Sequence, residues 1–191
     1  MSEAGRPPLR QLLASDLAAN AGGSGWRAMA WAWLLNPGFA AIGLHRVATH
    51  LLARGHRRSG FLLWAFNTRR SGCHFHPDAV IGAGLFLPHP VGVVIGSGAV
   101  LAENVCLYQG VTLGRNRKGG YPRIGTGAML FPGSVVVGDV RVGAGAVIGA
   151  TALVQADVPD HATIVVSQAQ TVRLPAAALG PDAVLGVDQV G

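Results

Sequence analysis

The feature that most constrains this chain is an aliphatic residue that returns every six positions through its second half. A period of six fits neither the 3.6-residue turn of an α-helix nor the two-residue alternation of a strand. It fits a parallel β-solenoid in which each group of six residues forms one side of a three-sided coil. The repeat occupies three phased stretches: Ile81, Leu87 and Val93; Ile95, Leu101, Leu107 and Leu113; and Ile124, Leu130, Val136, Val142, Ile148 and Val154.

The composition supports a β architecture with many tight corners. Of the 191 residues, 28 are glycine, 50% are hydrophobic and 13% are charged. A chain with this many apolar residues buries a substantial core, so general disorder is excluded. In the last stretch small or β-branched residues follow the aliphatic residue by four places, and we expect them to pack beside the next coil: Ala128, Ser134, Val140, Ala146 and Ala152.

The chain before the repeat has a helical pattern, with apolar residues three and four positions apart. This spacing predicts helices between about residue 9 and residue 71. Asn36 and Pro37 suit a helix start, as the cap and the first helical residue. The glycine-rich stretch 22–25 and Gly55 mark breaks between helices.

The change of pattern divides the chain into an N-terminal helical region (1–72), a β-helix domain (73–165) and a C-terminal cap or flexible tail (166–191). The apolar stretch from Ala28 to Leu44 is interrupted at Asn36 and is too short to span a membrane. We therefore expect no transmembrane segment, while a peripheral contact with a membrane surface stays open.

Charge and cysteine content bear on the remaining protein classes. The formal net charge is +6, and basic residues gather at Arg54 to Arg70 and at Arg115 to Arg123. No basic run is interleaved with aromatic residues, so we expect no nucleic-acid partner. Cys73 and Cys106 provide neither a disulfide framework nor a paired-cysteine zinc spacing, and the first residues lack the features of a signal peptide. These features favour a cytoplasmic protein.

Two interruptions of the repeat are candidates for functional sites, because regularly repeated residues mainly build the scaffold. The first is a two-residue shift between Val93 and Ile95. The second is the polar, glycine-rich segment from Arg115 to Pro122. Such an excursion from a regular coil predicts an extruded loop, and extruded loops commonly carry binding functions.

Five short motifs carry a more specific signal: Asn36-Pro-Gly-Phe39, Phe75-His-Pro77, Leu87-Pro-His-Pro-Val-Gly-Val-Val-Ile-Gly96, Tyr108-Gln-Gly-Val-Thr-Leu-Gly114 and Gly120-Tyr-Pro-Arg-Ile-Gly125. In these motifs the chain resembles the serine acetyltransferases and their shorter relatives among the sugar and exopolysaccharide O-acetyltransferases. The resemblance extends over about residues 37–159. It implies a mainly β fold, a left-handed parallel β-helix of hexapeptide repeats with an N-terminal α-helical region. It also implies a homotrimer with a CoA site between adjacent subunits.

The resemblance assigns His89 the role of general base. In such enzymes the matching histidine takes the proton of the acceptor hydroxyl while the oxygen attacks the thioester carbonyl, and neither a metal nor a covalent intermediate is required. Histidine suits this role because its charge changes near neutral pH. The expected activity is transfer of an acyl group from acetyl-CoA, or another acyl-CoA, to a hydroxyl of a small molecule such as serine, a serine-like amino acid or a sugar.

Three positions depart from the serine acetyltransferase pattern. Those enzymes have an aspartate immediately before the base and another fifteen residues before it, where this chain has Pro88 and His74. A histidine of their extended loop is replaced by Tyr121, and the shorter relatives share both this tyrosine and Pro88. We therefore expect activity, with His74 as a second candidate catalytic residue, and leave the acceptor open.

The remaining candidate residues are assigned to the two ligands of the expected reaction. For CoA, whose phosphates attract basic side chains, they are Gly114, Arg115, Arg117, Lys118, Arg123, Ala128 and Ala146, with Arg173 as a further candidate. For the acceptor they are His76, Tyr108, Gln109 and Tyr121.

Other functions of the same scaffold compete with this one. A solenoid carbonic anhydrase needs three convergent histidines, but His74, His76 and His89 precede the main run and no histidine pair recurs at coil spacing, so we expect no metal. Two alternatives stay open: a trimer that binds CoA or serves as a scaffold without turnover, and an acyltransferase that acts on a specialised biosynthetic intermediate. The first alternative predicts that the thioester is bound but not consumed.

Overall fold

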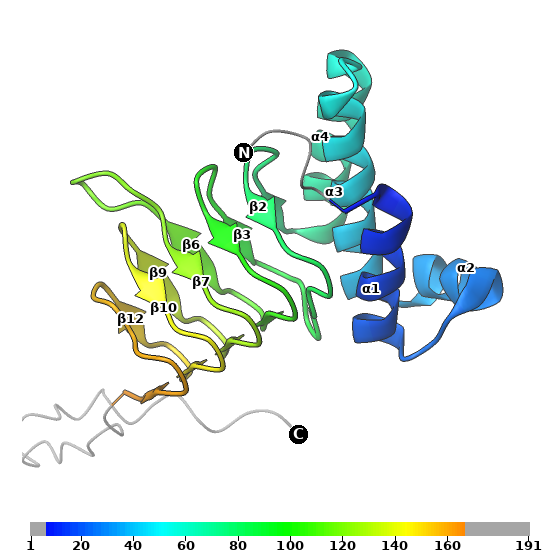
Figure 1. Cartoon of the computed structure of the whole chain (residues 1–191). Coiled ribbons are helices and arrows are strands. Elements are labelled where there is room, and N and C mark those ends of the chain that lie inside the picture. Colours follow the sequence, from blue (N-terminus) through cyan, green and yellow to red (C-terminus); the bar gives the residue numbers. More distant parts are fainter. Residues whose placement is uncertain (1–6, 167–191) are drawn as a thin grey trace, which may run out of the picture.

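The computed structural model describes residues 7–166, in which helices lead into a coil of short parallel strands (Figure 1). The described helices are α1 (Leu9–Ala21), α2 (Gly25–Leu35), α3 (Pro37–Ala53) and α4 (Arg57–Ser71). The predicted helical region is thus confirmed. Residues 167–191, which hold nearly all of the predicted tail and Arg173, lie outside the described residues.

The strands of the described residues form three parallel sheets, which are the three sides of the coil. The first sheet contains β1 (His74–Phe75), β3 (Val94–Ile95), β6 (Thr112–Gly114), β9 (Val135–Val137) and β12 (Leu153–Val154). The second contains β2 (Val80–Ile81), β4 (Val100–Leu101), β7 (Arg123–Ile124) and β10 (Arg141–Val142). The third contains β5 (Cys106–Leu107), β8 (Met129–Leu130), β11 (Val147–Ile148) and β13 (Thr163–Ile164). Successive strands belong to different sheets, so the chain winds as a parallel β-helix. The coil has the expected left-handed form.

The core of the coil is built from the aliphatic repeat. All the repeat residues are buried, and the most exposed of them is Ile81 at 8%. Parallel register stacks them in columns, with Ile95 opposite Leu113 and Leu113 opposite Val136. Each fully buried aliphatic side chain contributes about 1.5–3 kcal/mol by leaving water. These columns are therefore the main source of stability in a fold whose coils touch only their neighbours.

The first interruption of the repeat lies a few residues earlier than the sequence pattern placed it. The bridge between Phe86 and Cys106 and the hydrogen bond from the Gly110 amide to the Val91 carbonyl align the first two coils at this corner. Gly92 lies against Gly110, so the first coil has five residues between Phe86 and Gly92 where the second has three between Cys106 and Gly110. The two extra residues therefore lie within 88–91. The predicted shift after Val93 is therefore wrong in position.

The helical region covers the open edge of the first coil, where backbone amides and carbonyls would otherwise lack partners. Asp16 of α1 and Arg46 of α3 form a buried ion pair, with Arg46 Nε 2.9 Å from Asp16 Oδ2. Arg46 also donates to two edge carbonyls, at 2.5 and 2.6 Å, and Asp16 accepts from two edge amides, at 3.0 and 3.1 Å. The four edge residues are Ile81, Gly82, Gly84 and Leu85.

Two asparagines extend this cover. Asn20 donates to the Leu85 carbonyl at 2.7 Å and accepts from the Leu87 amide at 3.0 Å. Asn36 caps α3 as predicted, because its side chain accepts from the Phe39 amide at 2.8 Å. It also donates to the Asn20 carbonyl at 2.7 Å. The start of α3 is thereby held against the corner of the first coil.

Replacing Gly38 with alanine is expected to destabilise the protein by about 1–3 kcal/mol. The added methyl group would overlap the Leu87 carbonyl oxygen and lie 2.9 Å from Asn20 Oδ1, so the start of α3 would be forced away from the coil. Gly114→Ala is the matched control, since its methyl group would find its first neighbour at 3.6 Å. Urea unfolding measures both variants, and equal stability would contradict the close approach of α3 to Leu87.

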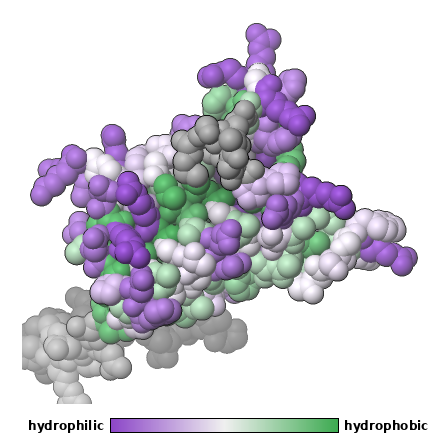
Figure 2. All heavy atoms as spheres, viewed as in Figure 1, coloured by the Kyte–Doolittle hydropathy of each residue, from purple (hydrophilic) through white to green (hydrophobic). Residues whose placement is uncertain are grey.

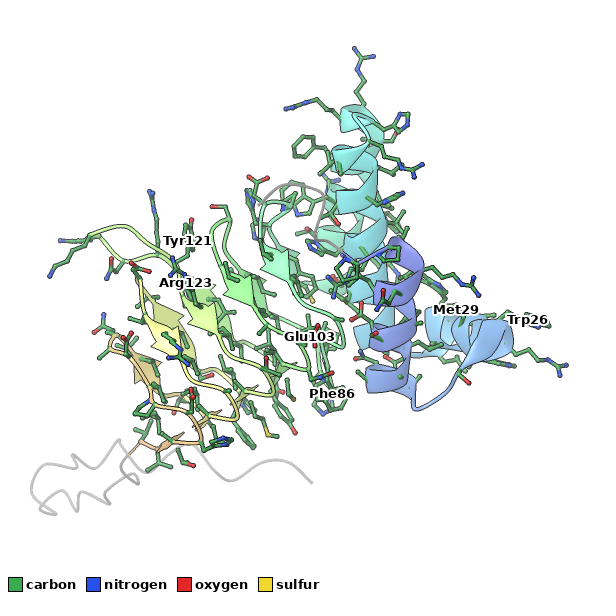
Figure 3. The ribbon with its side chains drawn as sticks, viewed as in Figure 1. Trp26, Met29, Phe86, Glu103, Tyr121 and Arg123 are labelled. Atoms are coloured by element: carbon green, nitrogen blue, oxygen red, sulfur yellow. The ribbon has the colours of Figure 1, made fainter. Side chains whose placement is uncertain are left out.

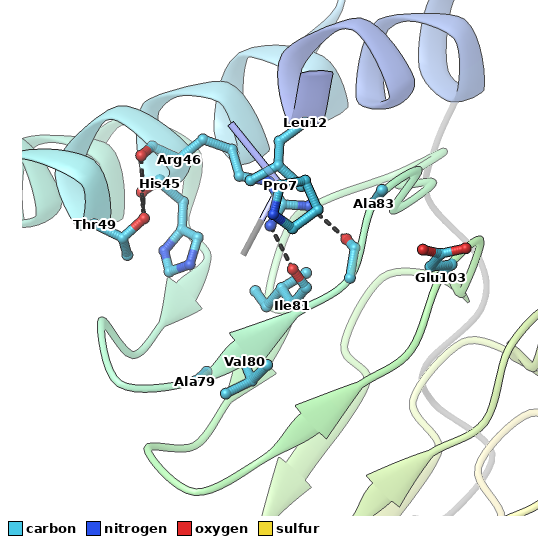
Figure 4. A pocket seen from close by; sticks show the side chains of 11 residues that line it. Pro7, Leu12, His45, Arg46, Thr49, Ala79, Val80, Ile81, Ala83 and Glu103 are labelled. Carbon is cyan, nitrogen blue, oxygen red and sulfur yellow. Dashed lines mark hydrogen bonds between the residues drawn. The ribbon is translucent and has the colours of Figure 1, made fainter. Parts of the chain in front are cut away.

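A small cavity of about 190 Å³ remains where α1 and α3 meet the first coil (Figure 4). Leu12, His45, Arg46 and Thr49 line it from the helices, and residues 79–83 line it from the coil. Figure 4 shows the Arg46 guanidinium bonded to the coil edge at this place. Because the guanidinium is already engaged there, this cavity belongs to the junction between the helices and the coil.

Candidate functional site

His89 lies in the corner insertion (residues 88–91), here called the His89 corner. Pro88 and Pro90 restrict the backbone on both sides of it. Pro90 is buried, and its carbonyl accepts a hydrogen bond from the Cys73 thiol, with 2.8 Å between Sγ and O. The His89 ring is exposed and makes no hydrogen bond or ion pair within residues 7–166. A rigid corner thus presents an imidazole whose nitrogens are available to a ligand.

A depression of about 420 Å³ opens beside His89. Its walls are the His89 corner, Pro37 at the start of α3, and Arg70 and Ser71 at the end of α4. Sequence reasoning missed Arg70 and Ser71, because both simply continue the helical pattern and nothing local marks them. Among the residues that line the depression, Arg70 is charged and none is a carboxylate.

His74, the second candidate catalytic residue, lies against the helical region. Its ring is edge-on to the indole of Trp64 in α4, with centroids 5.5 Å apart, and 6.4 Å from the ring of His76. The Trp64 indole N–H donates to the Phe75 carbonyl at 2.9 Å, which fixes the indole on β1. His74 does not line the depression beside His89. Its role as a catalytic residue stays a prediction.

Tyr108 and Gln109 occupy the equivalent corner of the next coil. The Tyr108 ring stacks on Phe131 of the following coil, with centroids 5.1 Å apart and planes at 10°. The Gln109 side chain is exposed, while its carbonyl accepts from the Gly133 amide. The structure therefore brings Tyr108, Gln109 and His89 to one corner of the coil, where the strands of the first sheet begin. This side of the first sheet is called its first edge below.

The second interruption is an extruded loop (residues 115–122) at the other edge of the first sheet (Figure 3). Tyr121 lies at its base with its ring against the backbone of Gly96 and Gly98, where a methyl group on either glycine would overlap the ring. The Tyr121 hydroxyl accepts from Ser97 Oγ at 3.0 Å. Tyr121 thus anchors the loop, and contact with an acceptor remains a prediction for it.

His76 belongs to this second edge as well. It lies at the end of β1, half-buried, and its Nδ1 accepts from the Asp78 amide at 3.2 Å. The candidate acceptor residues are therefore divided between the two edges of one sheet within a single chain.

Replacing Tyr121 with alanine is expected to speed tryptic cleavage at Arg117 and Lys118 by about tenfold, because the packed ring contributes to the free energy of local opening. Tyr121→Phe keeps the ring and loses only the hydrogen bond to Ser97, so its rate should change by no more than about threefold. Peptide mapping during limited proteolysis measures both rates. Equal cleavage of the alanine variant and the wild type would contradict an anchoring role.

Three basic side chains of the loop surround an open depression of about 610 Å³. Its lining includes Arg115, Arg117, Lys118, Val137 and Gln155. None of the three basic side chains forms an ion pair within the described part of the chain, so their charges are available to an anion.

The other residues predicted for CoA occupy different surroundings. Gly114 is the last residue of β6, next to the loop. Arg123 lies in β7 of the second sheet, and its Nη2 is 4.0 Å from Asp139 Oδ1. Ala128 and Ala146 are 0% exposed and belong to the core. These corner alanines fill the inside of the coil, as their place in the repeat indicated, and their assignment to the CoA site stays a prediction.

Both cysteines are buried inside the fold. Burial raises the pKa of the Cys106 thiol to about 11. Burial also raises the pKa of the Cys73 thiol, against the opposing effect of its hydrogen bonds with Ser71 and Val93. Both thiols are therefore protonated near neutral pH, and neither serves as a nucleophile.

Comparison with known proteins relates the chain to serine acetyltransferases. It is 36% identical over 140 residues to serine acetyltransferase 2 of Arabidopsis thaliana, a match that covers 72% of this chain and 43% of that protein. It is 38% identical over 131 residues to the serine acetyltransferase of Bacillus pumilus, covering 64% of this chain and 60% of that protein. The solved structure of the soybean serine acetyltransferase apoenzyme is similar, with a TM-score of 0.75 and 33% identity over 88% of this chain and 71% of that chain.

These matches concern only part of the related proteins. The chain spans about half the length of the curated relatives it matches, from 37% to 60%. No protein-family model matches the chain. The similarity to the soybean structure covers 88% of this chain, so it includes parts of both the helical region and the coil.

Proposed function

Because the chain belongs to the serine acetyltransferase family of hexapeptide-repeat proteins, we propose that it transfers an acetyl group from acetyl-CoA to a hydroxyl of a small molecule. The observation that carries the proposal is His89, an exposed imidazole on a rigid corner that faces a depression. Acetyl-CoA is a co-substrate in this reaction, and no resident cofactor takes part.

His89 acts as the general base. Its neutral imidazole takes the proton of the acceptor hydroxyl while the hydroxyl oxygen forms a bond to the carbonyl carbon of the thioester. The tetrahedral intermediate then collapses, the C–S bond breaks, and the CoA thiolate takes the proton back from the imidazolium. The acyl group passes directly to the acceptor, since burial keeps the thiols of Cys73 and Cys106 protonated.

Arg70 bears on the choice of acceptor. It is the charged residue in the wall of the depression beside His89, and it is exposed and forms no ion pair within residues 7–166. A guanidinium binds carboxylates well, often through two hydrogen bonds. Arg70 therefore favours an acceptor that carries a carboxylate, such as serine or a serine-like amino acid, over a neutral sugar.

The assembly proposed for this activity is a homotrimer. In one chain the base lies at one edge of the first sheet and the basic loop lies at the other edge. A CoA ester needs both, because the basic side chains meet its phosphates and the base must be near its thioester. A trimer in which the His89 corner of one subunit faces the loop of the next would unite them in one site.

Thiol release from acetyl-CoA by the whole 191-residue chain tests the proposed activity. The acceptors are L-serine, L-homoserine and neutral sugars, and release that depends on a carboxylate-bearing acceptor is the expected result. Calorimetric titration with acetyl-CoA is run in parallel. Binding without release for any acceptor would favour a CoA-binding scaffold, while the absence of binding would contradict the CoA site itself.

A further inference from the structure

The solvent-facing half of α2 is more apolar than a surface helix ordinarily is. Four large apolar side chains are exposed on it: Trp26 at 78%, Trp31 at 63%, Leu34 at 72% and Leu35 at 67%. Arg27 is the polar side chain among the exposed residues of this helix. The opposite face of α2 is already used, because Ala32 and Trp33 pack with Leu17 and Phe39 of the neighbouring helices.

The position of α2 makes this face accessible to a broad partner. The helix projects from the end of the molecule that lies away from the last coils (Figure 1). White and pale green spheres prevail around it in the space-filling view (Figure 2). A helix face that leaves two tryptophan and two leucine side chains in water is typical of an interaction site.

The exposed charge of the described helical region is entirely basic. Residues 7–72 contain eight arginines and one acidic residue, Asp16, which is buried with Arg46. The other seven arginines are exposed: Arg10, Arg27, Arg54, Arg57, Arg58, Arg69 and Arg70. Arg27 lies near the first residue of α2, and Arg70 lines the same depression as Pro37, which follows α2 by two residues. Both ends of the apolar face are therefore flanked by positive charge.

We propose that α2 is a docking surface for an anionic lipid bilayer, lying in the interface with its apolar face among the headgroups. Tryptophan and leucine on one face of a helix, with arginine at its borders, form the side-chain set that binds at this depth. Anionic headgroups complement the exposed arginines and add attraction for each of them near the surface. The contact is at the surface, because no helix in residues 7–166 is long and apolar enough to cross a membrane.

A second copy of the chain fits the same face less well. The helical region exposes arginines and, within residues 7–72, no acidic side chain that would pair with them. Two copies joined through α2 would bring like charges together, which costs free energy at an interface. A protein partner formed by a second copy is therefore the competing outcome of the experiment below.

Flotation of the whole 191-residue chain with lipid vesicles tests this proposal. Vesicles of phosphatidylcholine mixed with phosphatidylglycerol are expected to bind it at least about tenfold more tightly than phosphatidylcholine alone, with the difference shrinking in high salt. The Trp31→Ser/Leu35→Ser double variant should lose about tenfold or more of this binding. Leu153→Ser is the matched control, because Leu153 is a leucine of similar exposure (61%) on β12, and it should bind like the wild type.

A second variant reports on insertion directly. Trp26→Phe/Trp31→Phe keeps the apolar face but removes its fluorophores, so the blue shift of tryptophan emission on vesicle binding should largely disappear while flotation persists. Flotation that does not depend on phosphatidylglycerol, or that the serine double variant leaves unchanged, would overturn the proposal. So would light scattering in which the serine variant halves the mass of the assembly, since α2 would then join copies of the chain.

Discussion

The His89→Ala variant is expected to release thiol from acetyl-CoA about 10²–10⁴-fold more slowly than the wild type, the contribution usual for a positioned general base. His89 is exposed and makes no hydrogen bond within residues 7–166, so its removal takes away no contact that holds the fold. The loss should therefore appear in kcat, while the affinity for acetyl-CoA, measured by calorimetry, stays within about threefold.

His56→Ala is the matched control for this variant. His56 is exposed just before the start of α4, while Arg70, which borders the depression beside His89, lies in the last turn of the same helix. A helix of this length separates the two places by about 20 Å. His56→Ala should keep wild-type kcat, and a His89→Ala enzyme with more than about a tenth of the wild-type rate would exclude the base role.

The coil could be predicted from the sequence because every repeat position needs an aliphatic side chain that points into the core. A hexad period demands one inward side chain per side, and Ile95, Leu113 and Val136 meet it at the same register in successive coils. The helix start at Asn36 could be predicted for a similar reason, since capping is a local hydrogen bond. The insertion within residues 88–91 was misplaced because Val93, a buried corner residue, happens to fall in phase with Leu87.

The candidate site could be predicted less completely, because it depends on contacts between distant parts of the chain. The basic loop stood out as a departure from the repeat, whereas His89 was identified through the resemblance of its motif to the serine acetyltransferases. Arg70 did not stand out, since it reaches the His89 corner only through the docking of α4. The same holds for His74, whose neighbour Trp64 comes from a helix that carries no signal of this contact. Periodicity describes what each coil shares, whereas these positions depend on how the helices meet the first coil.

Replacing Arg46 with alanine is expected to lower the free energy of unfolding by about 3–5 kcal/mol, the cost of leaving one partner of a buried ion pair alone. The carboxylate of Asp16 is 0% exposed and would keep only its bonds from the amides of Gly84 and Leu85. The carbonyls of Ile81 and Gly82 would lose their donors as well. For a chain of this size the melting temperature should fall by about 10 °C.

Arg141→Ala is the control that isolates burial. The Arg141–Asp160 pair has nearly the same length, 3.0 Å, but its side chains are 67% and 52% exposed, so its loss should cost at most about 1 kcal/mol. The Asp16→Leu/Arg46→Met double variant separates charge from hydrogen bonding. It removes both buried charges yet leaves the coil edge without its side-chain partners, so it should recover only part of the stability lost in Arg46→Ala. Full recovery would show that the edge hydrogen bonds contribute little, and the helical region would then hold the coil by packing alone.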